Sequence, residues 1–399
     1  MKRINIISIL TALFAIAMAA LFSYHFGVQN NKIQTIKVGF IYSGDESTPY
    51  TFNFIRSQHA VEAALGDRVE TYVQSNINVE NSEKAFMYLI NNGCNLIFTT
   101  SSQFCPLAKE LAGQYPDVEF CAASADNVNE EPFYSNYHTF MGTIYEGRYV
   151  SGVIAGLKIK QMIEYGVIHP DEAIVGYVAS FPNAEVISGF TAFILGVRSQ
   201  VPQAVMKVKY TNTWTNYSIE RKCAEDFISE GCVLISQHSD TIGPAIACEN
   251  ARKRHPIYHI GYNQSMLDIA PGTSLTSTRI NWTPYFLGAI EAVLSGESIE
   301  KHIDATINGN DARAGFDKDW VQIVDMNSLL IPRDTPAIVD ETIKQLKNGE
   351  IMVFEGDYTG VDPSNPEDTI DLSKGYVENK DSSVPTFHYI LNDIITVEQ

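Results

Sequence analysis

The sequence predicts an α/β protein with parallel sheets, divided into two domains. Its 399 residues suit two domains at the usual size of roughly 100–200 residues each. From Lys37 onward, short β-branched or aromatic runs alternate with segments of helical spacing, as they do in βαβ units. Hydrophobic residues make up 45% of the chain and charged residues 19%, so most of the chain can bury a core.

Seven short runs rich in β-branched and aromatic residues predict the strands. Runs of this length and composition are typical of strands buried in a parallel sheet. They cover residues 37–42, 68–73, 94–100, 174–178, 205–210, 233–237 and 257–260.

Apolar stripes between these runs predict helices. In residues 218–230, Ile219, Cys223 and Phe227 recur every four residues, which places them on one helical face. A similar stripe predicts a helix over residues 184–200. We therefore expect helices to alternate with the strands and to cover the faces of parallel sheets.

Two further segments differ from this pattern. Residues 145–158 predict a helix with one face of small residues, including Gly152 and Gly156, that packs closely against a neighbour and lies between the two domains. Residues 357–380 are rich in Asp, Pro, Gly and Ser and predict an extended loop, whereas residues 387–397 are expected to add a final strand.

The charge of the chain excludes one class of partner. The formal net charge is −19, from 47 acidic and 28 basic residues. A protein that neutralises the phosphates of DNA or RNA needs a basic footprint, and none is visible in this strongly acidic sequence. We therefore expect no nucleic-acid partner.

Residues 1–30 predict a signal peptide or an N-terminal membrane anchor. Lys2 and Arg3 precede an apolar run over residues 6–22 whose end is crowded with alanines, as in a signal peptide. The run is near the shortest length that spans a bilayer, so a cleaved signal and a retained anchor both stay open. In either case we expect an extracytoplasmic protein, associated with the cell membrane or secreted.

The six cysteines do not predict a metal site. They show no C-x-x-C motif and no paired spacing with histidine, so we expect no zinc site, and no motif predicts a cofactor. Some of them can pair in an exported protein. The alternative is six small buried hydrophobic residues, and the sequence leaves both readings open.

Aromatic and polar residues follow nearly every predicted strand. In open parallel sheets, ligands bind beyond the carboxyl ends of the strands. Rings to stack on and a few hydrogen-bonding groups suit a planar, polar, uncharged ligand. The candidate ligand-binding residues from these loops are Asp45, Tyr50, Ser102, Phe104, Phe181, Trp214, His238, Asp240 and Asn263.

Each candidate also has an ordinary structural explanation. Trp214 can belong to a core or its rim, and His238 can be a structural histidine. Asp240 can cap a helix over residues 241–250. The prediction of a binding site therefore depends on the joint placement of these residues at strand ends.

Catalytic motifs are missing from the sequence. It contains no G-x-S-x-G, no H-E-x-x-H, no P-loop, and no G-x-G-x-x-G after the first strand. A nucleoside hydrolase would need a general base cluster, and the one that can be assembled is His238 with Asp240 and Asp45. Neighbours in sequence do not thereby form a catalytic group, so we predict no catalytic residues and no enzyme.

Six blocks of sequence carry a resemblance to a known family. They are Gly142–Gly156 (GTIYEGRYVSGVIAG), Val175–Ile187 (VGYVASFPNAEVI), Asn212–Thr215 (NTWT), Gln237–Asp240 (QHSD), Gly261–Met266 (GYNQSM) and Leu275–Ser277 (LTS). With these blocks in order, the chain resembles the basic membrane protein (BMP) family of solute-binding proteins, which are relatives of the purine-nucleoside receptors of ABC transporters. The similarity runs from Lys37 to about Glu355.

The resemblance implies the type I periplasmic-binding-protein fold. In that fold two Rossmann-like lobes with parallel sheets are joined by a three-crossover hinge. The first lobe is then expected to comprise residues 36–145 with 265–315, and the second residues 146–264 with 316–399. The resemblance also favours a monomer.

The resemblance further implies a purine nucleoside or purine base as ligand in the inter-lobe cleft, and an ABC permease as partner. An alternative is a membrane-tethered sensor of the same fold that reports its ligand to a signalling partner. By position, the stacking candidates are Tyr50, Phe104, Phe181 and Trp214, and the polar candidates are Ser102, Asp240, Asn263 and Asn281.

Overall fold

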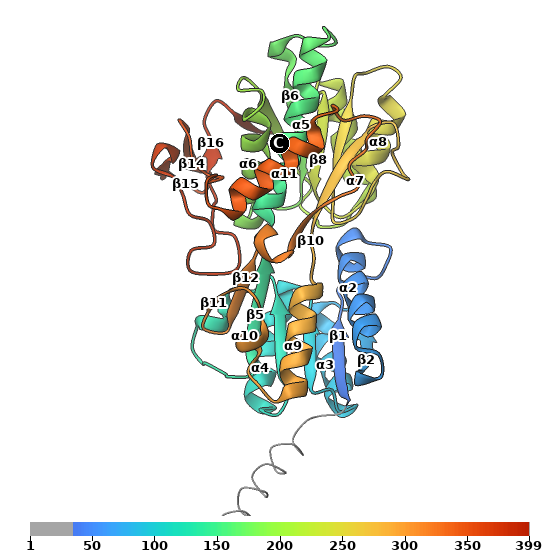
Figure 1. Cartoon of the computed structure of the whole chain (residues 1–399), viewed down its shortest axis with the longest axis vertical. Helices are drawn as coiled ribbons and strands as arrows, with labels where there is room; N and C mark the ends of the chain where they lie inside the picture. Colours follow the sequence, from blue (N-terminus) through green and yellow to red (C-terminus); the bar gives the residue numbers. More distant parts are fainter. Residues whose placement is uncertain (1–34, 399) are drawn as a thin grey trace, which may run out of the picture.

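The chain folds into two α/β lobes, which lie one above the other in Figure 1. A computed structural model describes residues 35–398, so the predicted signal or anchor over residues 1–30 lies outside the described residues. Each lobe has a seven-stranded, mainly parallel sheet with helices on both faces, as crossover connections require. Within residues 35–398, every helix is too short or too polar to cross a membrane.

The first sheet has the strand order β11-β12-β5-β4-β3-β1-β2, and all neighbours are parallel except β11 and β12. Its strands are β1 Ile36–Ile41, β2 Val69–Gln74, β3 Leu96–Thr99, β4 Glu119–Ala123, β5 Tyr137–Gly142, β11 Thr306–Asn308 and β12 Asp311–Ala314. Its helices are α2 Pro49–Leu65, α3 Val79–Asn91, α4 Cys105–Gln114, α9 Thr283–Ser295 and α10 Ile299–His302.

The second sheet has the order β13-β10-β9-β8-β6-β7-β17, and only β13 is antiparallel to its neighbour. Its strands are β6 Ile174–Ala179, β7 Val205–Tyr210, β8 Leu234–His238, β9 Tyr258–Tyr262, β10 Ser274–Ile280, β13 Val321–Val324 and β17 Ile395–Glu398. Its helices are α5 Ile144–Glu164, α6 Ala184–Arg198, α7 Tyr217–Ser229, α8 Gly243–Ala251 and α11 Thr335–Lys347.

The core follows these layers. One apolar cluster extends through both lobes, on the α2–α9 face of the first sheet and the α5–α6 face of the second. Smaller clusters lie beneath α3 and α4 and beneath α7 and α8. The seven predicted strands are confirmed with slightly shifted ends. Most of their apolar runs are buried in the two sheets, whereas β2 is a half-exposed edge strand.

The chain passes between the lobes three times, as the resemblance implies. It crosses at Thr143 between β5 and α5, over residues 281–282 between β10 and α9, and over residues 315–320 between β12 and β13. The crossings are bonded to one another, since the Asn281 amide donates to the Trp320 carbonyl at 2.7 Å. Three bonded connections form a hinge about which two lobes can close.

The sheet topology differs from the expected lobe boundaries for residues 265–280. The expectation that this segment belongs to the first lobe is wrong, because β10 pairs with β9 in the second sheet, with Ser277 opposite Gly261. Met266 packs with Ala245 in the same lobe. The chain therefore completes β10 before it crosses back to the first lobe.

Helices α5 and α6 meet backbone to backbone. A Cβ atom at Gly152 would overlap the carbonyl oxygen of Phe193, and one at Gly196 would overlap the carbonyl oxygen of Tyr149. The close packing predicted for this glycine-rich helix is confirmed. The expected position between the domains is wrong, because α5 packs on α6, β10 and α11 within the second lobe.

Residues 356–398, the C-terminal extension, contact both lobes. In the second lobe β17 pairs with β7 and Glu378 accepts from Ser188, and in the first lobe the Ser383 amide donates to Asp311 at 2.6 Å. The prediction of an extended loop over residues 357–380 is wrong for residues 359–371, because β14 (Thr359–Asp362) and β15 (Asn365–Asp371) form an antiparallel hairpin. Strand β16 (Ile390–Leu391) completes a small three-stranded sheet, drawn in dark red in Figure 1. The final strand expected near residues 387–397 is confirmed as β17, which pairs in parallel with β7.

All six cysteines are free. The alternative that the cysteines are small buried hydrophobic residues is confirmed for five of them, and the sixth is half-buried. The buried thiols are Cys94, Cys105, Cys121, Cys232 and Cys248, and the half-buried one is Cys223.

Candidate functional site

A cavity of about 580 Å³ lies between the lobes, where loops leave the carboxyl ends of both sheets. Its volume falls within the usual range of roughly 300–1,000 Å³ for small-molecule sites. The first lobe contributes Ser43, Gly44, Thr48, Tyr50, Thr51, Asn76, Ser101, Ser102, Gln103 and Ser124. The second lobe contributes Phe181, Glu185, Asn212, Thr213, Trp214, Thr215, His238, Asp240 and Tyr262.

Aromatic side chains form a continuous wall on the second-lobe side. The ring centroids of Phe181 and Trp214 are 5.4 Å apart at an interplanar angle of 62°, and those of His238 and Tyr262 are 4.9 Å apart at 65°. Trp214 keeps 39% of its surface exposed. From the first lobe, Tyr50 also lines the cavity, and its hydroxyl donates to the carbonyl oxygen of Thr100 at 2.7 Å.

Asp240 is the buried acidic group of this wall. Its backbone amide donates to the Trp214 carbonyl at 2.9 Å, and its Oδ1 accepts from Nδ2 of Asn263 at 3.3 Å. Burial raises the pKa of Asp240 to about 8, and repulsion from Glu220 and Glu185 adds to the effect. At neutral pH the group is therefore a carboxylic acid that can both donate and accept a hydrogen bond.

Glu220 of α7 holds the loop that carries Asp240. Its Oε2 accepts from the Ser239 hydroxyl at 2.8 Å, the Thr241 amide at 3.0 Å and the Thr241 hydroxyl at 2.7 Å. Burial raises the pKa of Glu220, although these hydrogen bonds favour its charged form. The alternative role of Asp240 as a helix cap is wrong, because α8 begins at Gly243 and the Asp240 side chain is bonded to Asn263.

His238 belongs to the aromatic wall, and Arg148 lies behind it. Burial lowers the pKa of His238 to about 4, and the positive charge of Arg148 acts in the same direction. The Arg148 guanidinium lies 3.7 Å from the ring centroid of Tyr262 and donates to the Gln237 carbonyl at 2.8 Å. This cation–π contact holds the Tyr262 ring against Arg148. Because its pKa is lowered, His238 is neutral at neutral pH.

The structure brings six of the ten predicted site residues to the cavity. The strand-end rule located them because the loops of both sheets converge on the cleft. These residues are Tyr50, Ser102, Phe181, Trp214, His238 and Asp240.

Four predicted site residues do not line the cavity. The carboxylate of Asp45 accepts hydrogen bonds from Ser47 and Asn76, so it is bonded to neighbouring loops and not directed into the cavity. The 3₁₀ helix over residues 102–104 turns the Phe104 ring into the first-lobe core. Asn263 lies behind Asp240 and reaches the cavity only through it, whereas Asn281 belongs to the hinge, where its side chain donates to Asp319.

Several lining residues were not predicted as site residues. Glu185 lies in the first turn of α6, after the Asn183 cap, and Asn212, two residues after the end of β7, adopts a positive φ of 52°. Tyr262 is the last residue of β9. Its position at a strand end was a usable signal, whereas the place of Glu185 inside a helix gave none.

The cluster considered for a hydrolase does not assemble. Among the described residues, no hydrogen bond or ion pair joins His238 to Asp240 or to Asp45. The nearest carboxylate oxygen paired with His238 belongs to Glu185, at 3.6 Å, which is too long for a hydrogen bond.

Comparisons with known proteins agree with this architecture. A family model described as ABC transporter substrate-binding protein PnrA-like (Bmp) matches residues 53–355. A purine-binding protein of Brucella abortus is 30% identical over 325 residues, covering 81% of this chain and 84% of the relative. A Haloferax volcanii protein, named as a glucose-binding protein of an ABC transporter, is 26% identical over 320 residues, covering 80% of this chain and 74% of the relative.

A solved structure shows the same fold. The solute-binding protein of an ABC transporter system from Aeropyrum pernix superposes with a TM-score of 0.64 at 15% identity, covering 79% of this chain and 92% of the other. Together with the two parallel sheets, this likeness confirms the type I periplasmic-binding-protein fold. Since the family model covers well over half of the chain, the chain belongs to the Bmp family of PnrA-like substrate-binding proteins of ABC transporters.

Proposed function

We propose that the inter-lobe cavity binds a purine base or purine nucleoside, and that the chain delivers this ligand to the permease of an ABC importer outside the cytoplasm. The observation that carries the proposal is a buried carboxyl group set among aromatic rings. Asp240 lines the cavity with Phe181, Trp214 and Tyr262 of its own lobe and Tyr50 of the other.

The chemistry of this wall suits a heterocyclic base. Stacking of a base on an aromatic side chain contributes about 1–3 kcal/mol. A neutral carboxylic acid offers a donor beside an acceptor, and the edge of a purine presents ring nitrogens beside amino or N–H groups. No lysine or arginine is among the cavity-lining residues of the described chain, and His238 is neutral, which disfavours an anionic ligand.

Family membership supports the same ligand class and a role without catalysis. The Brucella abortus relative is named as purine-binding. Members of the family are substrate-binding proteins, and we propose that this chain likewise binds and releases its ligand unchanged. The extracytoplasmic location follows from the same role. The monomer expected from the resemblance stays a prediction.

The hinge supplies the mechanism of capture. Both lobes contribute to the cavity, so a ligand bound by the second-lobe wall would draw Tyr50 and Ser102 of the first lobe toward it. Closure about the three crossings buries the ligand and creates a surface that differs from the open form. We infer that the permease recognises this closed form.

A sugar is the second candidate ligand. The first-lobe side of the cavity is rich in hydroxyl and amide groups, including Ser43, Thr48, Asn76, Ser102 and Gln103. Such groups suit a polyol, and the Haloferax volcanii relative is named as glucose-binding. The aromatic wall favours the purine, and a direct comparison of ligands separates the two.

The test is isothermal titration calorimetry with adenine, adenosine, guanosine and glucose, repeated with Trp214→Ala. We expect a purine to bind one per chain, and Trp214→Ala to weaken it about 5–150-fold through loss of stacking. Tyr165→Ala is the matched control, because Tyr165 is 74% exposed at the end of α5 and does not line the cavity.

The outcomes separate the candidates. Binding of glucose without any purine would favour the second candidate and contradict the first. Purine binding that survives Trp214→Ala unchanged would place the ligand elsewhere and overturn the site.

A further inference from the structure

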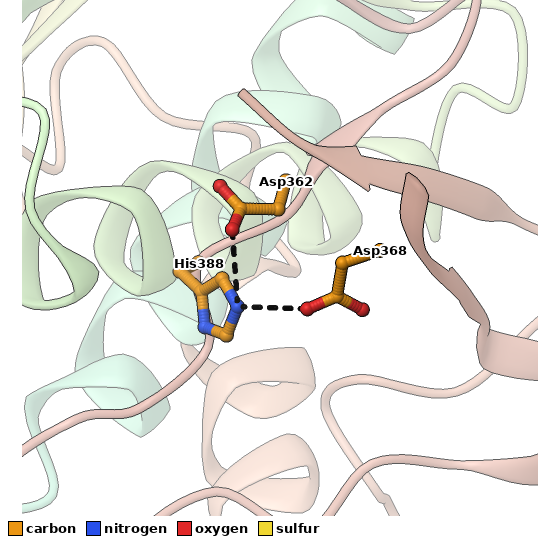
Figure 2. A group of neighbouring side chains, drawn as sticks. All are labelled: Asp362, Asp368 and His388. Atoms are coloured by element: carbon orange, nitrogen blue, oxygen red, sulfur yellow. Dashed lines mark ion pairs between the residues drawn. The ribbon is translucent and has the colours of Figure 1, made fainter. Parts of the chain in front are cut away.

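Asp362, Asp368 and His388 gather on the small sheet of the C-terminal extension (Figure 2). Their nearest ligand atoms all lie within 4.8 Å of one another, and Nε2 of His388 is 3.9 Å from Oδ2 of Asp362 and 3.8 Å from Oδ2 of Asp368. The family model ends at residue 355, so this cluster lies outside the region that defines the family. It is also separate from the cavity-lining residues.

The strand pairing brings these side chains together. Along the hairpin, Val361 pairs with Thr369 but Asp362 pairs with Asn365, so residues 366–368 form a bulge in β15. A bulge redirects the side chains that it carries. Asp362 ends β14, Asp368 lies in this bulge, and His388 is close to β16, which pairs with β14.

The imidazole of His388 is held in a defined tautomer. Its Nδ1 lies 2.7 Å from the backbone carbonyl oxygen of Thr386, and a carbonyl can only accept, so Nδ1 carries the proton. In the neutral ring Nε2 then has a free lone pair, and Nε2 is the atom that faces the two carboxylates. A backbone carbonyl on the far nitrogen is the usual outer partner of a metal-binding histidine.

The two carboxylates are oriented in the same way. Oδ1 of Asp362 accepts from the amide and the hydroxyl of Ser364, each at 2.8 Å, and the same hydroxyl also lies 2.9 Å from Oδ2 of Asp362. Oδ1 of Asp368 accepts from the Tyr389 hydroxyl at 3.2 Å. In both residues the second oxygen, Oδ2, is the one nearest to Nε2 of His388.

The charges in this cluster are unbalanced. Within residues 35–398, no lysine or arginine lies within 4.0 Å of either carboxylate, and the one basic partner of both is His388. Two negative groups and a lone pair converge on one point, which favours a cation there. A proton on His388 would also satisfy them, so an experiment must separate a metal ion from an ordinary ion pair.

We propose that Asp362, Asp368 and His388 bind a zinc ion, with water as the fourth ligand. One nitrogen and two carboxylate oxygens are ligands that zinc accepts in a tetrahedral site with an open position. Bond lengths near 2.0–2.2 Å put tetrahedral ligand atoms about 3.4 Å apart. Nε2 of His388 therefore needs to approach each carboxylate by about 0.5 Å, and the two carboxylate oxygens, which lie within 4.8 Å of each other, need to close by up to about 1.4 Å. Exposed fractions of 14% for Asp362, 42% for Asp368 and 39% for His388 leave them room to do so.

The ion would cross-link the strands of the C-terminal extension. Most side chains of β15 are exposed, so the small sheet has little apolar burial of its own. Metal binding to the folded state stabilises that state by mass action. The prediction of no zinc site was based on cysteine spacing, and this cluster uses no cysteine.

The test is calorimetric titration of the full chain with ZnCl₂ after dialysis against EDTA, alongside the melting temperature with and without the ion. We expect one Zn²⁺ per chain and a rise in melting temperature that EDTA reverses. Asp362→Asn, Asp368→Asn and His388→Ala should each weaken binding by at least about tenfold. The asparagine variants keep the size of the side chain, so they separate lost ligation from lost folding.

Two controls complete the design. His255→Ala removes an exposed histidine outside the cluster and should leave zinc affinity unchanged. Ca²⁺ and Mg²⁺ prefer sites made of oxygen ligands alone and should not displace zinc. The proposal is overturned if no saturable zinc binding occurs, because the cluster is then an ion pair. It is equally overturned if zinc binds with undiminished affinity to all three variants.

Discussion

His138 lies buried in the first sheet between two glutamates. Its Nε2 is 2.9 Å from the Glu119 carboxylate on β4, and its Nδ1 is bonded to Glu300 on α10. Burial lowers the pKa of His138, but the two hydrogen-bonded carboxylates outweigh this effect and raise it to about 8. The perturbation of interest is His138→Gln, which removes the titrating group.

The size of the effect follows from the pKa change. A rise from 6.5 in the unfolded chain to about 8 in the folded chain corresponds to about 2 kcal/mol of stability. Because the folded pKa is the higher one, this contribution is complete below pH 6.5. It decreases as the pH rises through about 8, where His138 loses its proton in the folded state.

The assay is urea unfolding of the wild-type chain and His138→Gln between about pH 6 and pH 9. Other groups titrate in this range, but they are shared by both proteins and cancel in the difference. We expect the difference in free energy of unfolding to shrink by about 2 kcal/mol from the acidic to the alkaline end. A difference that stays constant with pH would refute the assignment of a charged His138 between Glu119 and Glu300.

Two other predictions concern helix packing and ligand binding. Gly196→Ala would drive a Cβ atom into the Tyr149 carbonyl and should destabilise the fold by about 3 kcal/mol or more in chemical denaturation. Gly113→Ala is its control and should cost far less, because the contact there is the movable end of the Tyr134 side chain; equal losses would contradict the packing argument. The affinity for the proposed purine ligand, measured by calorimetry, should fall about tenfold per pH unit above pH 8, because Asp240 ionises there. In Asp240→Asn the affinity should not change with pH over the same range. If the affinity depends on pH in the same way in the wild-type chain and in Asp240→Asn, Asp240 does not bind the ligand as a neutral acid.

The alternation of buried strands and helices could be predicted from the sequence because parallel strands are apolar on both faces. Strand β10 was not predicted, because its SLTSTRI sequence is buried but consists mainly of hydroxyl side chains and so lacks the apolar composition of the other strands. The hairpin of β14 and β15 was predicted as loop because its Asp, Pro and Ser residues lie on a small exposed sheet. Composition therefore identifies many core strands, but not the buried strands β4 and β5, and not the small exposed sheet whose order comes from strand pairing.

The candidate site was predicted where strand ends alone determine the direction of a side chain. Phe181, Trp214 and Asp240 follow strands directly and reach the cavity. Phe104 also follows a strand, β3, but the 3₁₀ helix that carries it turns its ring into the first-lobe core. Asn281 depends on where the chain crosses between the lobes, which is a tertiary property that no local pattern contains.

Strand β17 pairs Ile395 with Met206, and β12 pairs Asp311 with Thr139, so each lobe is completed by residues that come much later in the chain. Contacts of such long sequence separation slow folding. A chain that ends before β17 would leave the backbone amides and carbonyls of β7 open to pairing with another molecule. If the chain is exported before it folds, the first lobe cannot be completed until residues 311–314 have crossed the membrane, and the second cannot be completed until residues 395–398 have crossed it.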